Sequence, residues 1–288
     1  MARAAGSSQI RHLAPPPVSD SRERYVTLLQ GCLTRELFLD EETHDISRSE
    51  WEPLVGSGLR DAMREKHWRI TRLGGDVHKR DTGNDWPPTA ETMVGRQRLS
   101  NVRACVESVL SDEVPGDLIE TGVWRGGVTI LMRGILAAWG DIDRRVWVAD
   151  SFQGLPTPDT EAFPADEGHD LSGVATLAVS AEQVQANFAR YDLLDDQVQF
   201  LEGWFRDTLP TAPIEHLAVL RLDGDLYEST MDALDALYPK VSIGGYVIVD
   251  DYGAWEPCRK AVDDYRRAHG ITDEIVKVDW TGVYWRRT

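Results

Sequence analysis

Four aspartates stand where two apolar segments of the sequence end, and their type and spacing suit metal chemistry. Asp223 and Asp225 close one apolar run, and Asp250 and Asp251 close a later one. Carboxylates without partners would repel one another strongly in a partly dry cleft, so a cation is expected among them. Oxygen ligands with no His or Cys nearby favour Mg²⁺, with Ca²⁺ or Mn²⁺ as substitutes. Capping of the following helices by Asp is the alternative.

A glycine-rich turn follows an earlier apolar run. Residues 120–127 read Glu-Thr-Gly-Val-Trp-Arg-Gly-Gly and lead into a helical pattern. Gly122 and the pair at 126–127 would let the backbone turn tightly and approach a ligand. The phosphate-binding spacing GxGxxG is absent, which favours a methionine-type cofactor over a dinucleotide. A turn with a purely structural role is the alternative.

An acidic residue, Asp150, ends the next apolar run and is followed by Ser151. A carboxylate at such a strand end can accept hydrogen bonds from both hydroxyls of a ribose. Together with the glycine turn, it indicates a nucleoside-containing cofactor. A helix cap is the alternative interpretation of Asp150.

The elements that must position these residues alternate along the second half of the chain. Apolar runs that ought to form buried strands alternate with helical patterns, which predicts a parallel sheet with right-handed crossovers. The last two segments, 274–279 and 282–286, predict an antiparallel hairpin at the sheet edge. The predicted strands are 117–123, 145–150, 198–204, 217–223 and 245–250, and the predicted helices are 128–139, 181–191, 229–239 and 257–269.

The first part of the chain has a different character. Residues 1–22 are rich in Ala, Ser, Arg and Pro without apolar periodicity, which predicts a disordered tail. Residues 23–110 predict an N-terminal helical lid or oligomerisation region, with two or three short helices up to about residue 83 and a longer one over about 90–110. Residues 111–288 are the expected sheet domain.

Composition excludes several classes of protein. The chain of 288 residues carries a formal net charge of −17, which would repel nucleic acid. Its three cysteines form no CxxC pair, so neither a disulfide framework nor a zinc site is indicated. The N-terminus has no signal-peptide pattern and no run of eighteen apolar residues occurs, so we expect a soluble, cytoplasmic protein without a membrane span.

Six ordered motifs within about residues 85–287 closely resemble the macrocin-type O-methyltransferases, which methylate sugar hydroxyls of macrolide, aminocoumarin and related natural products. The resemblance implies a Rossmann-like class I methyltransferase that depends on S-adenosylmethionine and Mg²⁺. It further implies a mostly parallel seven-stranded sheet with helices on both faces. The motifs are 120–127, 147–154, 193–198, 203–205, 223–225 and 250–252.

The resemblance also implies roles for individual residues. It places the Mg²⁺ ligands at Asp225, Asp250 and Asp251, with Asp225 also acting as the general base. Asp223 is then a cofactor or scaffold contact, although spacing alone does not decide between Asp223 and Asp225. The implied cofactor contacts are Glu120, Thr121, Gly122, Asp150, Ser151, Thr92, Met93, Trp204 and Phe205.

Residues that contact the acceptor are expected in the N-terminal region. Residues 42–82, where a lid and sugar-sensing residues would lie, match the family poorly. A glycosylated small molecule is the expected partner, and helices before such a sheet often form dimer contacts, so we expect a homo-oligomer. Possible bases outside the aspartates are His67, His78 and His169, with solvated surface positions as the alternative. Possible aromatic walls of an acceptor pocket are Trp51, Trp68 and Trp86, with core packing of the N-terminal helices as the alternative.

Three rival functions remain at this point. A catechol-type metal-dependent methyltransferase has the same sheet and a similar carboxylate site. A nucleotide-sugar oxidoreductase is disfavoured by the missing GxGxxG spacing. A non-catalytic protein that keeps the cofactor fold is the third.

Overall fold

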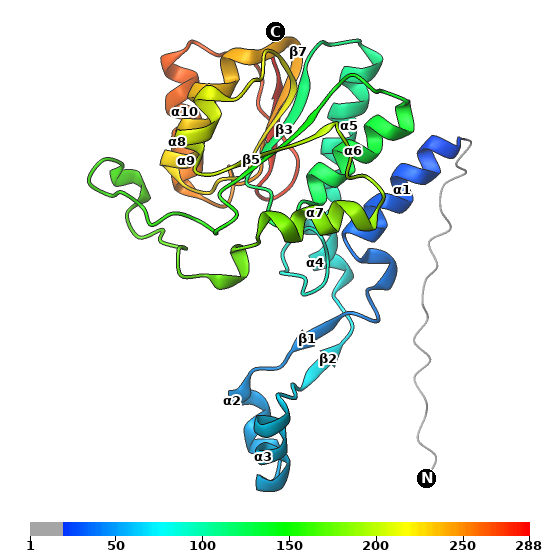
Figure 1. The fold of residues 1–288 in the computed structure, drawn as a ribbon. Helices are drawn as coiled ribbons and strands as arrows, with labels where there is room; N and C mark the ends of the chain where they lie inside the picture. Colours follow the sequence, from blue (N-terminus) through cyan, green and yellow to red (C-terminus); the bar gives the residue numbers. More distant parts are fainter. Residues whose placement is uncertain (1–19) are drawn as a thin grey trace.

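A seven-stranded sheet forms the centre of the computed structural model, which describes residues 20–288 (Figure 1). The strand order is β5-β4-β3-β6-β7-β9-β8, and the first five of these strands are parallel. The strands are β3 (Asp117–Thr121), β4 (Val146–Asp150), β5 (Val198–Glu202), β6 (Leu217–Leu222), β7 (Val241–Val249), β8 (Val276–Lys277) and β9 (Val283–Arg286).

Helices cover both faces of the sheet because successive side chains of each strand enter two separate cores. In β3, Leu118 joins one apolar cluster and Ile119 the other. On the first face lie α1 (Ser21–Leu33), α5 (Arg96–Ser111), α6 (Gly127–Trp139) and α7 (Ala181–Arg190), and on the second α8 (Phe205–Thr208), α9 (Tyr227–Leu237) and α10 (Glu256–Ala268). The predicted α/β fold is confirmed.

The predicted C-terminal hairpin is also confirmed. Strand β9 pairs antiparallel with both β7 and β8, so β8 forms the outer edge. Trp285 of β9 is fully buried against the second core, which fixes the strand to the sheet. The turn between the two strands thereby reaches the carboxyl ends of the parallel strands.

The long helix before the sheet begins later than predicted. We expected it from about residue 90, but α5 begins at Arg96 after the N-cap Gly95. Residues before it form a turn in which the Thr92 hydroxyl accepts a hydrogen bond from the Val94 N–H at 3.0 Å. Hydroxyl side chains that bond nearby backbone favour turns over helix interiors, which explains the difference.

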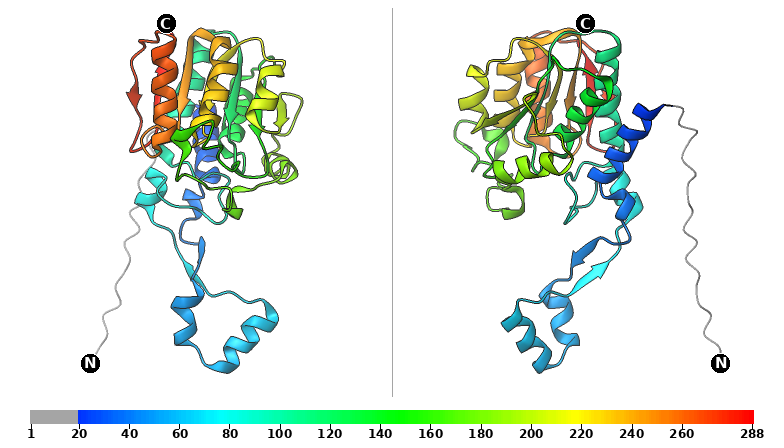
Figure 2. Two further views of the ribbon diagram at one scale, coloured as in Figure 1. Left: turned by 90° about the vertical axis from the view of Figure 1, so that its left-hand side faces the viewer. Right: turned by 45° about the vertical axis from the view of Figure 1, so that its right-hand side comes forward.

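An arm projects from the body, as Figures 1 and 2 show. Its stalk is an antiparallel strand pair that the sequence analysis did not predict, because each strand has three residues and no apolar alternation. The strands are β1 (Thr43–Asp45) and β2 (Thr71–Leu73), the helices at the far end are α2 (Arg48–Trp51) and α3 (Ser57–Lys66), and α4 (Val77–Thr82) returns the chain to the body.

The predicted boundary at residue 110 does not separate the N-terminal region from the sheet domain, because α1 and α5 pack in the core of that domain. Val26 and Leu29 of α1 and Val102 of α5 belong to the same buried cluster as α6 and the sheet. Helix α1 begins at Ser21, and residues 1–19 of the predicted tail lie outside the described residues. Within residues 20–288, no helix is long and apolar enough to cross a membrane.

Candidate active site

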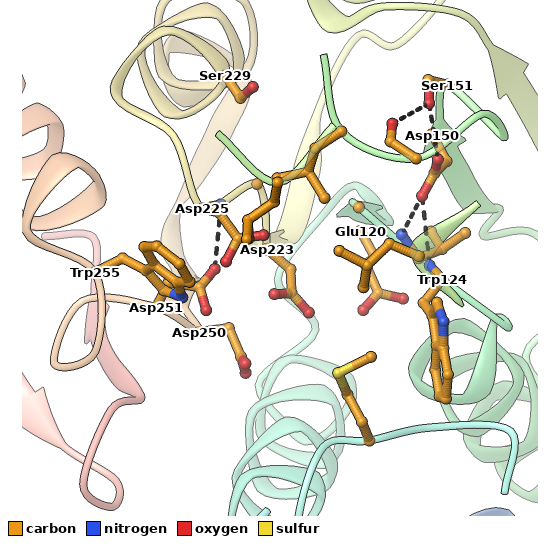
Figure 3. Close-up of a pocket in the computed structure, with 18 of the residues that line it drawn as sticks. Glu120, Trp124, Asp150, Ser151, Asp223, Asp225, Ser229, Asp250, Asp251 and Trp255 are labelled. Atoms are coloured by element: carbon orange, nitrogen blue, oxygen red, sulfur yellow. Dashed lines mark hydrogen bonds between the residues drawn. The ribbon is translucent and has the colours of Figure 1, made fainter. Parts of the chain in front are cut away.

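A cavity of about 230 Å³ lies at the carboxyl ends of the parallel strands, where the loops after β3, β4, β5, β6 and β7 meet (Figure 3). Strand order reverses there, since the chain runs from β3 outward to β5 and then returns to β6 on the other side of β3. Ligands of open α/β sheets bind at this kind of switch point. The cavity is therefore the candidate active site.

One side of the cavity, which we call the glycine-turn side, is formed by Glu120, Gly122 and Asp150. Gly122 has φ +90°, and a Cβ there would lie 1.8 Å from the carbonyl oxygen of Asp223. Only glycine allows the two loops to approach so closely. Thr121 is buried between the strands and does not line the cavity, and its hydroxyl donates to the Arg221 carbonyl at 3.4 Å.

Asp150 holds the glycine turn through the backbone. Its Oδ2 accepts hydrogen bonds from the N–H groups of Val123 at 2.8 Å and Trp124 at 3.4 Å, and its Oδ1 accepts from Phe152 at 2.8 Å. Burial raises the pKa of Asp150, and these N–H bonds oppose that rise. No helix begins directly after β4, so the helix-cap interpretation is wrong. The ribose role stays a prediction.

Three non-glycine residues in the loops around the cavity take left-handed backbone angles. They are Trp124 at φ 50°, Phe152 at φ 56° and Asp225 at φ 57°, in the loops after β3, β4 and β6. Such conformations cost free energy and persist only where the surroundings enforce them, which is common at functional sites.

The remaining predicted cofactor residues also border the cavity. Thr92 and Met93 reach it from the turn before α5, Ser151 from the end of β4, and Trp204 and Phe205 from the start of α8. The Ser151 hydroxyl donates to the Gly154 carbonyl at 2.7 Å, which closes the loop after β4. Of the predicted cofactor residues, Thr121 alone lies outside the lining.

The opposite side, which we call the acidic side, consists of Asp223, Asp225, Asp250 and Asp251. One carboxylate oxygen each of Asp223, Asp250 and Asp251 lie within 4.8 Å of one another, so these three could hold a metal ion. Asp225 is not a member of this group, although its backbone N–H donates to Asp251 Oδ2 at 3.3 Å. Three carboxylates at this spacing fit a hard divalent cation, and the geometry favours Asp223 over the predicted Asp225 as the third ligand.

Two of these aspartates are not the unpaired anions that the sequence analysis assumed. Arg221, fully buried in β6, pairs with Glu120, with Asp250 and, at 2.7 Å, with Asp223. Arg98 of α5 adds a second cation to Asp250. Burial alone would raise the pKa of Asp250, but the two arginines hold it below its ordinary value.

The other two aspartates have no such partner in the described part of the chain. Burial, together with the charges of Asp223 and Asp250, raises the pKa of Asp225 to about 7. Burial and the charge of Asp225 raise the pKa of Asp251 well above its ordinary value. A cation is therefore expected because Asp225 and Asp251 have no cationic partner and because carboxylate oxygens of Asp223, Asp250 and Asp251 lie close together. Four unpaired charges are no longer the reason.

Sequence analysis missed both arginines. Arg221 interrupts the apolar run of β6, and a charged residue inside a buried strand is a signal that a counter-charge lies nearby. Arg98 carries no comparable local signal. It also bonds Asp279 at 3.0 Å and the Gly83 carbonyl at 3.4 Å, so it joins the acidic side to the β8–β9 turn and to the end of α4.

The predicted histidines and tryptophans divide between the site and other regions. His67, His78 and His169 do not line the cavity, although the His169 ring lies 5.7 Å from that of Trp255, which does. Trp51 and Trp68 belong to the arm, and Trp86 borders the cavity. The further tryptophans in the lining are Trp124, Trp204, Trp255 and Trp280.

Comparisons with known proteins agree on a family. Residues 22–287 match the family of macrocin O-methyltransferases. Demethyldecarbamoylnovobiocin O-methyltransferase from Streptomyces niveus is 60% identical over 210 residues, which cover 73% of this chain and 80% of that protein. Mycinamicin III 3''-O-methyltransferase from Micromonospora griseorubida is 56% identical over 222 residues, 76% of this chain and 87% of that protein.

Solved structures extend the agreement to three dimensions. The structure of the O-methyltransferase NovP matches with a TM-score of 0.80 and 49% identity, over 93% of this chain and 99% of that chain. The calicheamicin methyltransferase CalS11 matches with a TM-score of 0.53 and 19% identity, over 81% of this chain and 93% of that chain, and shows the shared fold alone.

Proposed function

This chain belongs to the macrocin O-methyltransferase family and is an O-methyltransferase, and from that premise we propose that it transfers a methyl group from S-adenosylmethionine to a sugar hydroxyl of a glycosylated natural product. The observation that carries the proposal is a single cavity with a glycine turn on one side and clustered carboxylates on the other. The names of the relatives support a sugar acceptor, since one is a 4'-O-methyltransferase of a rhamnosyl-tetracenomycin and another is mycinamicin III 3''-O-methyltransferase.

The glycine-turn side suits the methyl donor. S-adenosylmethionine, when bound, supplies an activated sulfonium methyl group together with an ammonium group and a ribose. Glu120 is buried and its Oε2 has no hydrogen-bond partner, so it is available to accept from the ammonium group. Gly122 leaves the backbone open beside it, and Asp150 and Ser151, which line the same cavity, are the proposed ribose contacts.

The acidic side suits a divalent cation. We assign the ligands to Asp223, Asp250 and Asp251, which replaces Asp225 in the set predicted from sequence. Mg²⁺ at this position would lower the pKa of an acceptor hydroxyl, as it does for bound water. Arg221 and Arg98 keep Asp250 ionised and oriented for that purpose.

Asp225 is the proposed general base. An alcohol is a weak nucleophile, and a carboxylate of ordinary pKa, roughly 4, is a weak base toward it. Burial raises the pKa of Asp225, so this carboxylate accepts a proton more readily than an exposed one. As the bond from the acceptor oxygen to the methyl carbon forms and the carbon–sulfur bond breaks, the hydroxyl proton passes to Asp225.

Replacement of this base is the direct test. The variant Asp225→Asn should lose about a hundred- to ten-thousand-fold in turnover, the range expected for a general base. Binding of S-adenosylhomocysteine, measured by calorimetry, should stay near the wild-type value because the glycine-turn side is untouched. Near-normal turnover would refute the role of Asp225.

A catechol-type methyltransferase is the second candidate, since a metal held by carboxylates is expected for that reaction too. A panel of deoxysugar glycosides and catechols with labelled methyl donor separates the two functions. Methylation of a glycoside supports the sugar acceptor, and methylation of catechols alone contradicts it.

We also propose that the arm contacts a second copy of the chain. Leu54, in the short 3-10 turn Glu52–Leu54, is 83% exposed, and Trp68, just after the end of α3, is 55% exposed. Exposed apolar side chains gathered on one element commonly mark an interface. Light scattering of the purified protein tests this, and a monomeric mass at micromolar concentration would contradict it.

A further inference from the structure

Helix α9 begins directly after the Asp223–Asp225 loop, and its own sequence gives it no cap. Its N-cap residue is Leu226, whose side chain makes no capping hydrogen bond. First-turn N–H groups have no partner within a helix and need one from elsewhere. Here Asp166 supplies it, because its Oδ1 accepts from the Tyr227 N–H at 2.6 Å and its Oδ2 from the Glu228 N–H at 3.1 Å.

Asp166 belongs to the long loop that joins β4 to α7, and it is the single buried residue between positions 153 and 180. It lies in the short 3-10 turn Pro164–Asp166 and has no exposed surface. A buried carboxylate is costly unless it is hydrogen-bonded, and two N–H groups at the positive end of a helix meet that need. The loop is thus attached to α9 by the Asp166 carboxylate and by the Phe163 ring, whose centroid lies 6.2 Å from that of Tyr227.

The same loop reaches both sides of the cavity. Leu171 and Leu177 line the cavity itself. The Thr176 carbonyl accepts a hydrogen bond from the Trp124 indole N–H at 2.8 Å, on the glycine-turn side. The His169 ring meets Trp255 next to the acidic side.

We propose that Asp166 is a positioning residue for methyl transfer. By capping α9 from the loop, it holds Leu171 and Leu177 over the methyl donor and fixes the start of the helix that follows Asp225. It touches neither donor nor acceptor, since it does not line the cavity. The inference rests on the proposed function, because it assigns the loop to the binding of S-adenosylmethionine.

Binding of S-adenosylhomocysteine to the full-length protein tests the inference without knowledge of the acceptor. The variant Asp166→Asn keeps the size of the side chain but turns one acceptor into a donor that faces an N–H group. Its Kd for S-adenosylhomocysteine should rise on the order of ten-fold, because the covering loop is no longer held in place.

Ser180→Ala is the matched control. Ser180 ends the same loop and its hydroxyl accepts from the Gln183 N–H at 3.3 Å, so the variant also removes a helix cap, but on α7 and away from the cavity. It should lower the melting temperature and leave the Kd unchanged. If Asp166→Asn does the same, Asp166 has a structural role only and the proposal is overturned.

Two further outcomes are distinguishable. If Asp166→Asn does not fold, Asp166→Ser removes the carboxylate and leaves a side chain too short to accept from both N–H groups; it should show the same rise in Kd, and a wild-type Kd would overturn the inference. Wild-type protein that binds no S-adenosylhomocysteine contradicts the proposed function, and the inference falls with it.

Discussion

The two sides of the cavity are held in place by different forces. On the glycine-turn side, the Asp150 carboxylate accepts hydrogen bonds from three backbone N–H groups, one in its own loop and two in the loop after β3. On the acidic side, Arg221 and Arg98 hold Asp250 through buried ion pairs, with Arg98 in the cavity wall and Arg221 outside it. One side depends on backbone shape, and the other on the balance of buried charge.

This difference determines which substitutions each side tolerates. A loop held by backbone hydrogen bonds is displaced when a side chain is added at a position where only glycine fits. A charge-held cluster fails when one cation is removed, because several carboxylates are then buried without a partner. The glycine-turn side should therefore be most sensitive to substitution at Gly122, and the acidic side at Arg221.

The largest effect is expected at Gly122, where the two sides meet. The variant Gly122→Ala would place a Cβ 1.8 Å from the Asp223 carbonyl oxygen at φ +90°. Both strands would have to move, so we expect the free energy of unfolding to fall by more than about 4 kcal/mol. Urea denaturation measures it.

Gly140→Ala provides the control for backbone strain alone. Gly140 has φ +71° but no atom within 4 Å of an added Cβ. Its substitution should cost about 1–2 kcal/mol, the usual penalty of the left-handed conformation. Equal losses at the two positions would mean that the close approach of the loops at Gly122 contributes nothing.

The next effect is expected at Arg221 on the acidic side. The variant Arg221→Met leaves Glu120, Asp223 and Asp250 without this cation, and unfolding free energy should fall by about 3–5 kcal/mol. The control Arg267→Met removes an exposed pair with Asp264 and should cost less than about 1 kcal/mol. A small loss at Arg221 would show that the carboxylates are neutral or solvated without it.

The same contrast explains which parts of the site could be predicted from the sequence. The glycine-turn side was predictable because Glu120 and Gly122 are neighbours and Asp150 ends the adjacent strand. The sheet was predictable because its parallel strands are short apolar runs that alternate with helical patterns. On the acidic side, Arg98 pairs with Asp250, which lies 152 residues away in sequence, and Asp166 caps the neighbouring helix α9 at Tyr227, 61 residues away. Nothing in their local sequence indicates these partners.

Backbone conformation also limited the prediction of ligands. Asp223 and Asp225 are two residues apart, so an extended chain would direct both side chains to one side. Asp225 instead takes φ 57°, which breaks that alternation, and Asp223 joins the carboxylate group in its place. Residue spacing does not reveal a left-handed residue that is not glycine, so the sequence could not predict which of the two aspartates groups with Asp250 and Asp251.

The smallest effect is expected at Asp232 of α9, a half-buried carboxylate in the cavity wall that has no buried arginine like those of the acidic side. Burial and the neighbouring Glu228 raise the pKa of Asp232 from 3.8 to about 6, and Arg206 offsets this only in part. Because the folded pKa is raised, the stability linked to its proton is fully present below pH 3.8 and is lost as pH rises through about 6.

The variant Asp232→Asn removes this loss. It should be more stable than wild type by about 1 kcal/mol or less near pH 8, since solvent screens a half-exposed group, and should show no such gain near pH 4. Urea denaturation at the two pH values measures the difference. An equal gain in stability at pH 8 and pH 4 would mean that the gain does not come from the charge of Asp232. An unpaired carboxylate in this wall would then be tolerated, in contrast to the acidic side, where arginines pair with Asp223 and Asp250.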